Sequence, residues 1–372
     1  MHTQSTQFNL VRDFAPGWFA SVMGTAVIAV AFFSFRDVIP FAEMWMLLFL
    51  GLGILMFSVM LIPWTLRWFL HFDAVWRDLN HPVSAAFFPT MPISLLVIGI
   101  ALEKAGPLFL THSILLPLLE ALWFLGASGI AIFAVVILNT FFLQPGVKWE
   151  MANLGWLIPP VSALLVPVLG STLATEYAGT DLGTINLLGS LVFLGFGGML
   201  FVFVMTAVFA RYIFHDLPPV HLAPTIWIGL APSSILAIVM IKIVKPATLF
   251  FNANDSLNTL NVIGKFIGIS LWGFALFWLV LVIAVTTFHH RKTPLPFALS
   301  WWAFVFPLGA FVVATGAIYA AVPVAFFQWT GLAALSGLLV LWATVGVRTV
   351  GGIASGTIFK SHVSTPQPVP TK

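Results

Sequence analysis

Long apolar segments recur along the chain, and short polar or Pro/Gly-containing stretches separate them. A bilayer core about 30 Å thick needs roughly 20 helical residues per crossing. The segments that meet this length are 15–35, 41–62, 82–102, 113–138, 153–173, 185–210, 222–242, 263–287, 297–319 and 324–346. The pattern therefore predicts an all-α integral membrane protein with ten transmembrane helices.

These spans predict one transmembrane domain over residues 15–346. A cytoplasmic segment of residues 1–14 is expected before it, and a cytoplasmic tail of residues 347–372 after it. The tail is first Gly-rich and then Pro-rich, so we expect it to be disordered. No short apolar region is followed by a small-residue cleavage site, so we expect the first apolar segment to remain as a span.

Basic residues in the connections predict the orientation, because cytoplasmic loops carry an excess of Lys and Arg. The side that holds both termini carries Arg12, Arg67, Arg77, Lys148, Arg211, Arg291, Lys292, Arg348, Lys360 and Lys372. The opposite side carries Arg36, Lys104, Lys242, Lys245 and Lys265. We therefore expect a multi-pass protein of the plasma or inner membrane with both termini in the cytoplasm.

Composition supports the membrane assignment. Charged residues make up 7% of the chain and apolar residues 60%, against about 25% and about 45–50% in soluble proteins. The lipid bilayer is therefore the first expected partner. The absence of cysteine excludes disulfides and thiolate metal sites. A net charge of +3 is too small to indicate binding to nucleic acid. No metal or cofactor is expected.

Proline is unevenly distributed among the predicted spans. Odd-numbered spans carry it internally or at their entry, as Pro16, Pro89, Pro92, Pro159, Pro160, Pro167, Pro224, Pro232 and Pro307. Among even-numbered spans the fourth has Pro117, while Pro63 and Pro323 are expected outside span ends. The spacing predicts five hairpins in quasi-fivefold array, each with a kinked first helix, around a central pore. The alternative is that proline is simply commoner in membrane helices.

Small and hydroxylic residues also concentrate on the odd-numbered spans. Such residues either let helices pack closely or offer hydrogen bonds to a partly dehydrated solute. For any single residue packing is the simpler explanation, whereas the set favours a polar path. The pore-lining and kink candidates are Gly24, Thr25, Pro89, Thr90, Ser94, Pro159, Pro160, Ser162, Pro232, Ser233 and Pro307.

Four of these spans resemble one family of membrane proteins. The motifs are residues 14–25 (FAPGWFASVMGT), 81–94 (HPVSAAFFPTMPIS), 156–160 (WLIPP) and 300–309 (SWWAFVFPLG), the last being the most specific. They are similar to the tellurite-resistance/dicarboxylate transporter family, which is related to plant guard-cell slow anion channels. The resemblance extends over residues 14 to about 346.

The resemblance implies ten helices as five hairpins, a pore lined by the odd-numbered helices, and a homotrimer with one pore per subunit. It also implies that Phe306, immediately before Pro307, occludes the pore. The implied function is transport of a small anion, such as a C4-dicarboxylate resembling malate or an inorganic anion. A sulfite- or tellurite-type exporter and a gated chloride or nitrate channel are the alternatives.

Charged residues near the span ends are candidates for pore vestibules. Lys242, Lys245 and Lys265 are expected at one mouth, and Arg67 and Arg211 at the other. Each is alternatively an interfacial residue whose stem lies along apolar surface. Glu120 is the best candidate for proton coupling, although its even-numbered span is expected outside the pore.

Other functional classes fit the sequence less well. A membrane-embedded enzyme needs a reactive constellation at bilayer depth. His-Glu-x-x-His, paired aspartates within spans and a cysteine nucleophile are absent, and no G-x-x-x-x-G-K-[ST] loop for ATP is present. A structural or receptor protein would not require five bent helices. The sequence therefore favours transport without its own ATP hydrolysis.

Overall fold

The structure, a computed structural model, describes residues 9–143, 148–215, 220–292 and 295–360. Within these ranges the chain is helical and has no strand. Ten of the described helical segments are long and apolar enough to span a membrane. They are Pro16–Ser34, Ala42–Leu70, Ala85–Leu108, His112–Leu143, Leu154–Glu176, Asp181–Phe214, Leu222–Lys242, Asn254–Phe288, Leu299–Ala321 and Ala325–Ala354. The predicted all-α fold is confirmed.

The spans divide into an inner and an outer set. In odd-numbered spans, 72–94% of the most apolar 18-residue stretch is buried, against 22–39% in even-numbered spans. The inner α-helices are α1 (Phe19–Ser34), α4 (Thr90–Ala105), α6 (Ile158–Glu176), α8 (Leu230–Lys242) and α11 (Val305–Ala321). The outer ones are α2 (Ala42–Leu70), α5 (His112–Leu143), α7 (Asp181–Phe214), α10 (Leu257–Lys292) and α12 (Ala325–Ala354). The outer helices expose their apolar side chains, which is the arrangement that lipid favours.

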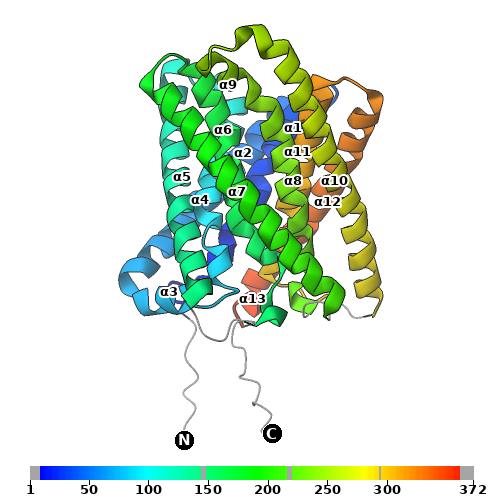
Figure 1. The fold of residues 1–372 in the computed structure, drawn as a ribbon. Coiled ribbons are helices and arrows are strands. Elements are labelled where there is room, and N and C mark those ends of the chain that lie inside the picture. The colour runs from blue at the N-terminus through cyan, green and yellow to red at the C-terminus, as the bar shows by residue number, and fades with distance from the viewer. Residues whose placement is uncertain (1–8, 144–147, 216–219, 293–294, 361–372) are drawn as a thin grey trace, which may run out of the picture.

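The inner helices form a closed ring. Helix α1 packs against α4, α4 against α6, α6 against α8, α8 against α11, and α11 returns to α1. Each inner helix also packs against the outer helix that follows it: α2, α5, α7, α10 or α12 (Figure 1). Sequential hairpins with short connections produce this neighbour order directly. The chain is therefore a ring of five helical hairpins.

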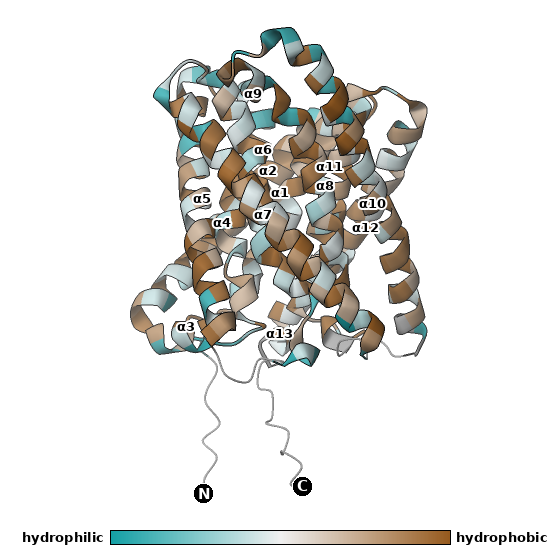
Figure 2. Ribbon diagram, viewed as in Figure 1, coloured by the Kyte–Doolittle hydropathy of each residue, from teal (hydrophilic) through white to brown (hydrophobic). Residues whose placement is uncertain are grey.

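Short helices mark the two ends of the bundle. Helices α3 (Phe72–Leu79) and α13 (Thr357–Lys360) lie at one end, here called the proximal end, and α9 (Val244–Phe250) lies at the opposite, distal end (Figure 1). Hydrophobic residues cover the middle of the bundle, and hydrophilic residues gather toward the two ends (Figure 2). This distribution matches an apolar lipid layer between two aqueous phases.

Tryptophan side chains of the outer helices bind the inner ones. Trp342 of α12 donates to the Thr25 hydroxyl of α1 (3.0 Å), and Trp272 of α10 donates to the Thr315 hydroxyl of α11 (2.8 Å). Trp123 of α5 donates to a backbone carbonyl of α6 at Val166 (3.0 Å). A buried indole N–H needs an acceptor, so each bond fixes how one outer helix sits on the ring.

Several helices extend beyond the predicted spans, and two of these extensions, in α2 and α12, change an expectation. Helix α2 continues to Leu70, so Pro63 lies inside it and not beyond its end. Arg67 in its last turn bonds to the Arg12 carbonyl and to Asp78. Helix α12 continues to Ala354 and α13 (Thr357–Lys360) follows after a turn, so the first part of the expected disordered tail is mostly helical. Thr349 there accepts from Trp302, and Gly352 allows Ile358 to approach. Residues 361–372 lie outside the described residues.

Candidate functional site

Every inner span enters the ring as a 3₁₀ helix and then becomes α-helical. The 3₁₀ segments are η1 (Pro16–Trp18), η2 (Ala85–Phe87), η5 (Leu154–Leu157), η6 (Val220–Gly229) and η8 (Leu299–Phe304). Because all five inner spans run from the proximal to the distal end, these transitions lie in the proximal part of the ring (Figure 1). Such a tighter helix brings side chains at every third position into one line.

Proline occupies one register at four of these transitions. Pro92, Pro160, Pro232 and Pro307 are each the third residue of their α-helix. An N–H in the first helical turn has no intrahelical partner, so proline there costs no hydrogen bond. These four prolines therefore stand near the starts of the α-helices, at the 3₁₀ junctions within the spans, and a kink at each junction stays a prediction. They begin α-helices, whereas Pro167 lies inside α6.

Phe306 lies at the last of these transitions. It is the second residue of α11, directly after η8, and 5% of its surface is exposed. The preceding aromatic residues are held by neighbouring spans: Trp302 donates to Thr349 of the outer helix α12 (3.2 Å), and Phe304 meets Trp227 of the inner segment η6 edge to face (5.3 Å). These contacts fix the backbone that carries Phe306.

Most serine and threonine candidates are bonded to the backbone. Thr90 donates to the carbonyls of Pro16 and Phe87, and Ser94 to those of Phe19 and Thr90. Two of these bonds join α4 to the start of the first span. Ser162 donates to the carbonyl of Pro159 (2.5 Å). A pore-lining role for these residues stays a prediction, because their present bonds serve helix packing.

Two further candidates on α1 also contact neighbouring helices. Thr25 accepts the Trp342 bond, so its hydroxyl is engaged with an outer helix. A Cβ added at Gly24 would come within 3.1 Å of both Trp302 and Val305. Gly24 therefore permits close approach of the first and ninth spans, a common use of small residues in membrane helices.

Ser233 differs from the other hydroxyl candidates. It lies on α8 directly after Pro232 and is fully buried, and its hydroxyl has no hydrogen-bond partner among the residues that the structure describes. Ser234, the next residue, donates to the Leu230 carbonyl (2.7 Å). Buried hydroxyls are normally bonded, so the Ser233 hydroxyl keeps an unused hydrogen-bonding capacity.

The basic candidates separate toward the two ends. At the proximal end Arg67 is almost fully buried and is paired with Asp78 (2.5 Å), and Arg211 is buried and donates to the Glu150 carbonyl (3.1 Å). At the distal end Lys242 ends α8, while Lys245 is exposed on α9 and Lys265 lies on α10. Arg67 is thus a structural contact of α2 with α3, and Lys242 is the candidate that belongs to an inner helix.

Lys242 joins a charged cluster that the sequence did not reveal. The Glu103 carboxylate of α4 accepts from Lys104 (2.6 Å), from Lys242 (3.3 Å) and from the Thr172 hydroxyl of α6 (2.9 Å). We call Glu103, Lys104, Thr172 and Lys242 the Glu103 cluster. Its members come from three inner spans at the distal end of the ring.

Glu120 is separate from the ring interior. It lies on α5, is buried, and accepts from the Asn186 amide of α7 (2.8 Å). Both helices belong to the outer set. The expected position of Glu120 outside the inner ring is confirmed, and its suggested coupling role stays a prediction.

Comparison with known proteins supports the arrangement. Residues 13–350 match the family described as voltage-dependent anion channel. The chain is 30% identical to an uncharacterised transporter of Methanocaldococcus jannaschii, with 96% of this chain and 98% of the relative aligned. It is 23% identical to a sulfite efflux pump of Trichophyton rubrum (94% and 93% aligned) and 23% identical to a malic acid transport protein of Schizosaccharomyces pombe (82% and 70% aligned).

These matches confirm the family resemblance drawn from the four sequence motifs. The family match covers nine spans in full and the tenth up to residue 350, and the named relatives are transporters and efflux pumps, not enzymes. The chain is a multi-pass membrane protein that belongs to the voltage-dependent anion channel family and functions in anion transport.

Proposed function

We propose that anions cross the membrane along the axis of the five inner spans and that Phe306 blocks this path in its closed state. The observation that carries the proposal is the register of α11. Phe306 is buried next to the aligned proline at the point where 3₁₀ backbone becomes α-helix. An aromatic ring at such a point can close a narrow path by its bulk and by excluding water.

The proposed substrate is a C4-dicarboxylate resembling malate or a small inorganic anion. Relatives whose names refer to malic acid and to sulfite support both classes. A sulfite- or tellurite-type exporter and a gated chloride or nitrate channel are the competing members of the same functional class. Hydroxyl groups and helix-end dipoles would select the anion, because full charges are costly at bilayer depth.

The proposed setting is the plasma or inner membrane, with both termini in the cytoplasm. The excess of Lys and Arg at the proximal end supports this orientation. We further propose a homotrimer with one anion path per subunit. The large exposed apolar residues of the outer helices allow contact with lipid or with another copy of the chain.

Anion flux into proteoliposomes tests the Phe306 block. We expect Phe306→Ala to raise flux of chloride, nitrate, sulfite or malate by about tenfold or more, because the ring no longer closes the path. Phe311→Ala is the matched control. Phe311 lies on the same helix and is fully buried, but its ring stacks on Trp272 of the outer helix α10 (5.7 Å).

The outcomes separate clearly. Raised flux in Phe306→Ala but not in Phe311→Ala, with cations excluded, supports the proposal and ranks the substrates. Loss of flux in Phe306→Ala, or equal increases in both variants, contradicts a block by Phe306. Failure of every variant to pass any anion contradicts anion conduction itself.

A further inference from the structure

In the Glu103 cluster, a nearly buried carboxylate lies between two partly exposed lysines. The side chain of Glu103 is 8% exposed, whereas those of Lys104 and Lys242 are 26% and 23% exposed. Both ammonium groups and the Thr172 hydroxyl donate to this one carboxylate. Two ammonium groups and one hydroxyl are donors of the kind that bind a free carboxylate or other anion, and here all three face a side-chain carboxylate.

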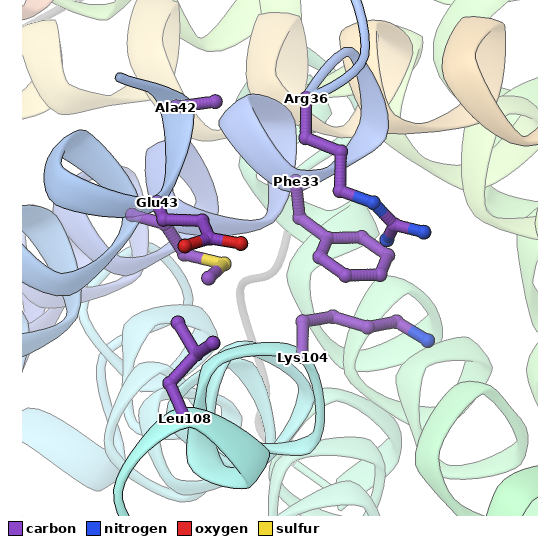
Figure 3. A pocket seen from close by; sticks show the side chains of 7 residues that line it. Phe33, Arg36, Ala42, Glu43, Lys104 and Leu108 are labelled. Atoms are coloured by element: carbon purple, nitrogen blue, oxygen red, sulfur yellow. The ribbon is translucent and has the colours of Figure 1, made fainter.

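A small cavity adjoins this cluster. It has a volume of about 110 Å³ and is lined by Phe33, Arg36, Ala42, Glu43, Met46, Lys104 and Leu108. The Phe33 ring has the Arg36 guanidinium 4.1 Å from its centre and the Lys104 ammonium 5.3 Å from it. Both cationic groups extend to the same side of Phe33, and Glu43 lies on the other side (Figure 3). A third positive group, from the end of the first span, therefore stands beside the cluster.

The acidic groups beside the cluster, apart from Glu103, are exposed or paired elsewhere. Glu43 lines the same cavity as Lys104 but is exposed, so solvent weakens its effect on the lysines. Glu103 balances one of its two lysines. Asp37 pairs with Arg36 at 3.8 Å and is itself 93% exposed, so solvent weakens this pair. Glu176, at the distal end of α6, pairs with His112 (3.3 Å). An anion that approaches the distal end of the ring therefore meets partly uncompensated lysines on inner helices.

We propose that the Glu103 cluster is an anion-binding site at the distal mouth of the path, in which the Glu103 carboxylate occupies the place of the substrate. The ligand is a carboxylate or another oxyanion of similar size. This inference rests on the proposed anion conduction. The substrate displaces Glu103 from Lys104, Lys242 and Thr172, and Glu103 takes the place back when the substrate leaves.

Such an exchange solves a problem of anion conduction. Two lysines alone would hold an anion tightly and slow its release, whereas conduction needs binding that is strong enough to enter and weak enough to leave. A resident carboxylate competes for the same donors and keeps the lysines partnered between substrates. It also keeps these partly exposed lysines in ion pairs.

The test measures half-saturating anion concentration and maximal flux separately, from each side of the membrane. Phe306→Ala proteoliposomes, sorted by protease access to a terminal tag, provide a measurable background, and malate, sulfite and chloride are the probes. Glu103→Gln should lower the half-saturating concentration at the distal side by about tenfold and also lower maximal flux, because the competing charge is gone. Lys242→Gln should raise that concentration by about tenfold.

Lys245→Gln is the matched control. It also removes one positive charge, but Lys245 is an exposed residue of α9, three positions after Lys242 in the sequence. It gives the size of the general electrostatic effect, which added salt screens. Glu103→Asp keeps the carboxylate. Its half-saturating concentration and maximal flux should therefore stay nearer to those of the Phe306→Ala background than the values of Glu103→Gln do. If Lys242→Gln fails to fold, Lys104→Gln removes the other lysine that donates to Glu103.

Three negative outcomes are distinguishable. If the Phe306→Ala background passes no anion from either side, the proposed conduction is wrong. If it passes anions but the half-saturating concentrations of Glu103→Gln and Lys242→Gln match that of Lys245→Gln, the exchange site is wrong and conduction stands. An effect of equal size on both sides of the membrane also contradicts a site at the distal mouth.

Discussion

At the scale of residues, Ser233 and Ser234 are neighbours whose hydroxyls have different surroundings. Ser234 bonds to its own helix, whereas the buried Ser233 hydroxyl has no partner within the described part of the chain. Loss of an unsatisfied hydroxyl removes no protein bond, so Ser233→Ala should leave the unfolding temperature unchanged or raise it. If that hydroxyl donates to the passing anion, the same change should weaken anion binding by about tenfold.

Flux through the Phe306→Ala background checks this prediction, with Ser234→Ala as control. Ser234→Ala should lower the unfolding temperature slightly and leave the half-saturating concentration within about twofold of the background, because its hydroxyl is already bonded to Leu230. The reverse pattern, with transport affected by Ser234→Ala alone, would show that Ser234 and not Ser233 faces the anion.

The sequence predicted some of these residues and missed others for physical reasons. Phe306 was identified by the motif around it, and Ser233 by its place on a proline-containing span. Glu103 was not identified as part of a site, because in the sequence it is simply a charged residue at the end of a span. Its partners Thr172 and Lys242 are 69 and 139 positions away. Such a distance in sequence gives no sign of contact until the hairpins close into a ring.

At the scale of elements, glycine decides how closely helices approach. Gly331 of α12 faces Phe35 at the end of the first span, and a Cβ there would overlap the Phe35 ring. Phe35 is 1% exposed and stacks on Tyr319, so the ring has no free space to move into. Gly331→Ala should therefore destabilise the fold by about 1–3 kcal/mol.

Gly337 on the same helix is the matched control, because a Cβ there meets nothing within 4 Å. Gly337→Ala should be neutral or stabilise the helix by about 0.5–1 kcal/mol. Thermal unfolding in one detergent, followed by light scattering or tryptophan fluorescence, compares the two. Equal unfolding temperatures for both variants would mean that α12 does not pack on Phe35 as described.

The hairpin pattern was predictable, but the form of the inner helices was not. Proline spacing alone indicated which spans are inner, and burial confirms this division. The same prolines predicted kinks but did not reveal that Pro92, Pro160, Pro232 and Pro307 stand near the starts of α-helices that follow 3₁₀ turns. Sequence cannot easily distinguish these cases, because both place proline near the start of an apolar segment.

At the scale of the whole molecule, the five hairpins make the two ends of the ring different. The proximal end has the 3₁₀ entries and Phe306, and the distal end has the Glu103 cluster. A barrier near one end and a binding site near the other would let an anion bind before it reaches the block. Membrane orientation therefore decides which aqueous phase supplies the anion to that site.

The cysteine-free chain allows a direct test of this orientation, since any introduced cysteine is the only one. Asp255→Cys places a thiol at the distal end and Asp73→Cys places one on α3 at the proximal end, and both native side chains are exposed. The excess of Lys and Arg at the proximal end predicts that it faces the cytoplasm. In intact cells a membrane-impermeant thiol reagent should label Asp255→Cys, and Asp73→Cys should react after permeabilisation. The opposite labelling would place the Glu103 cluster in contact with cytoplasmic anions and make it the loading site for export.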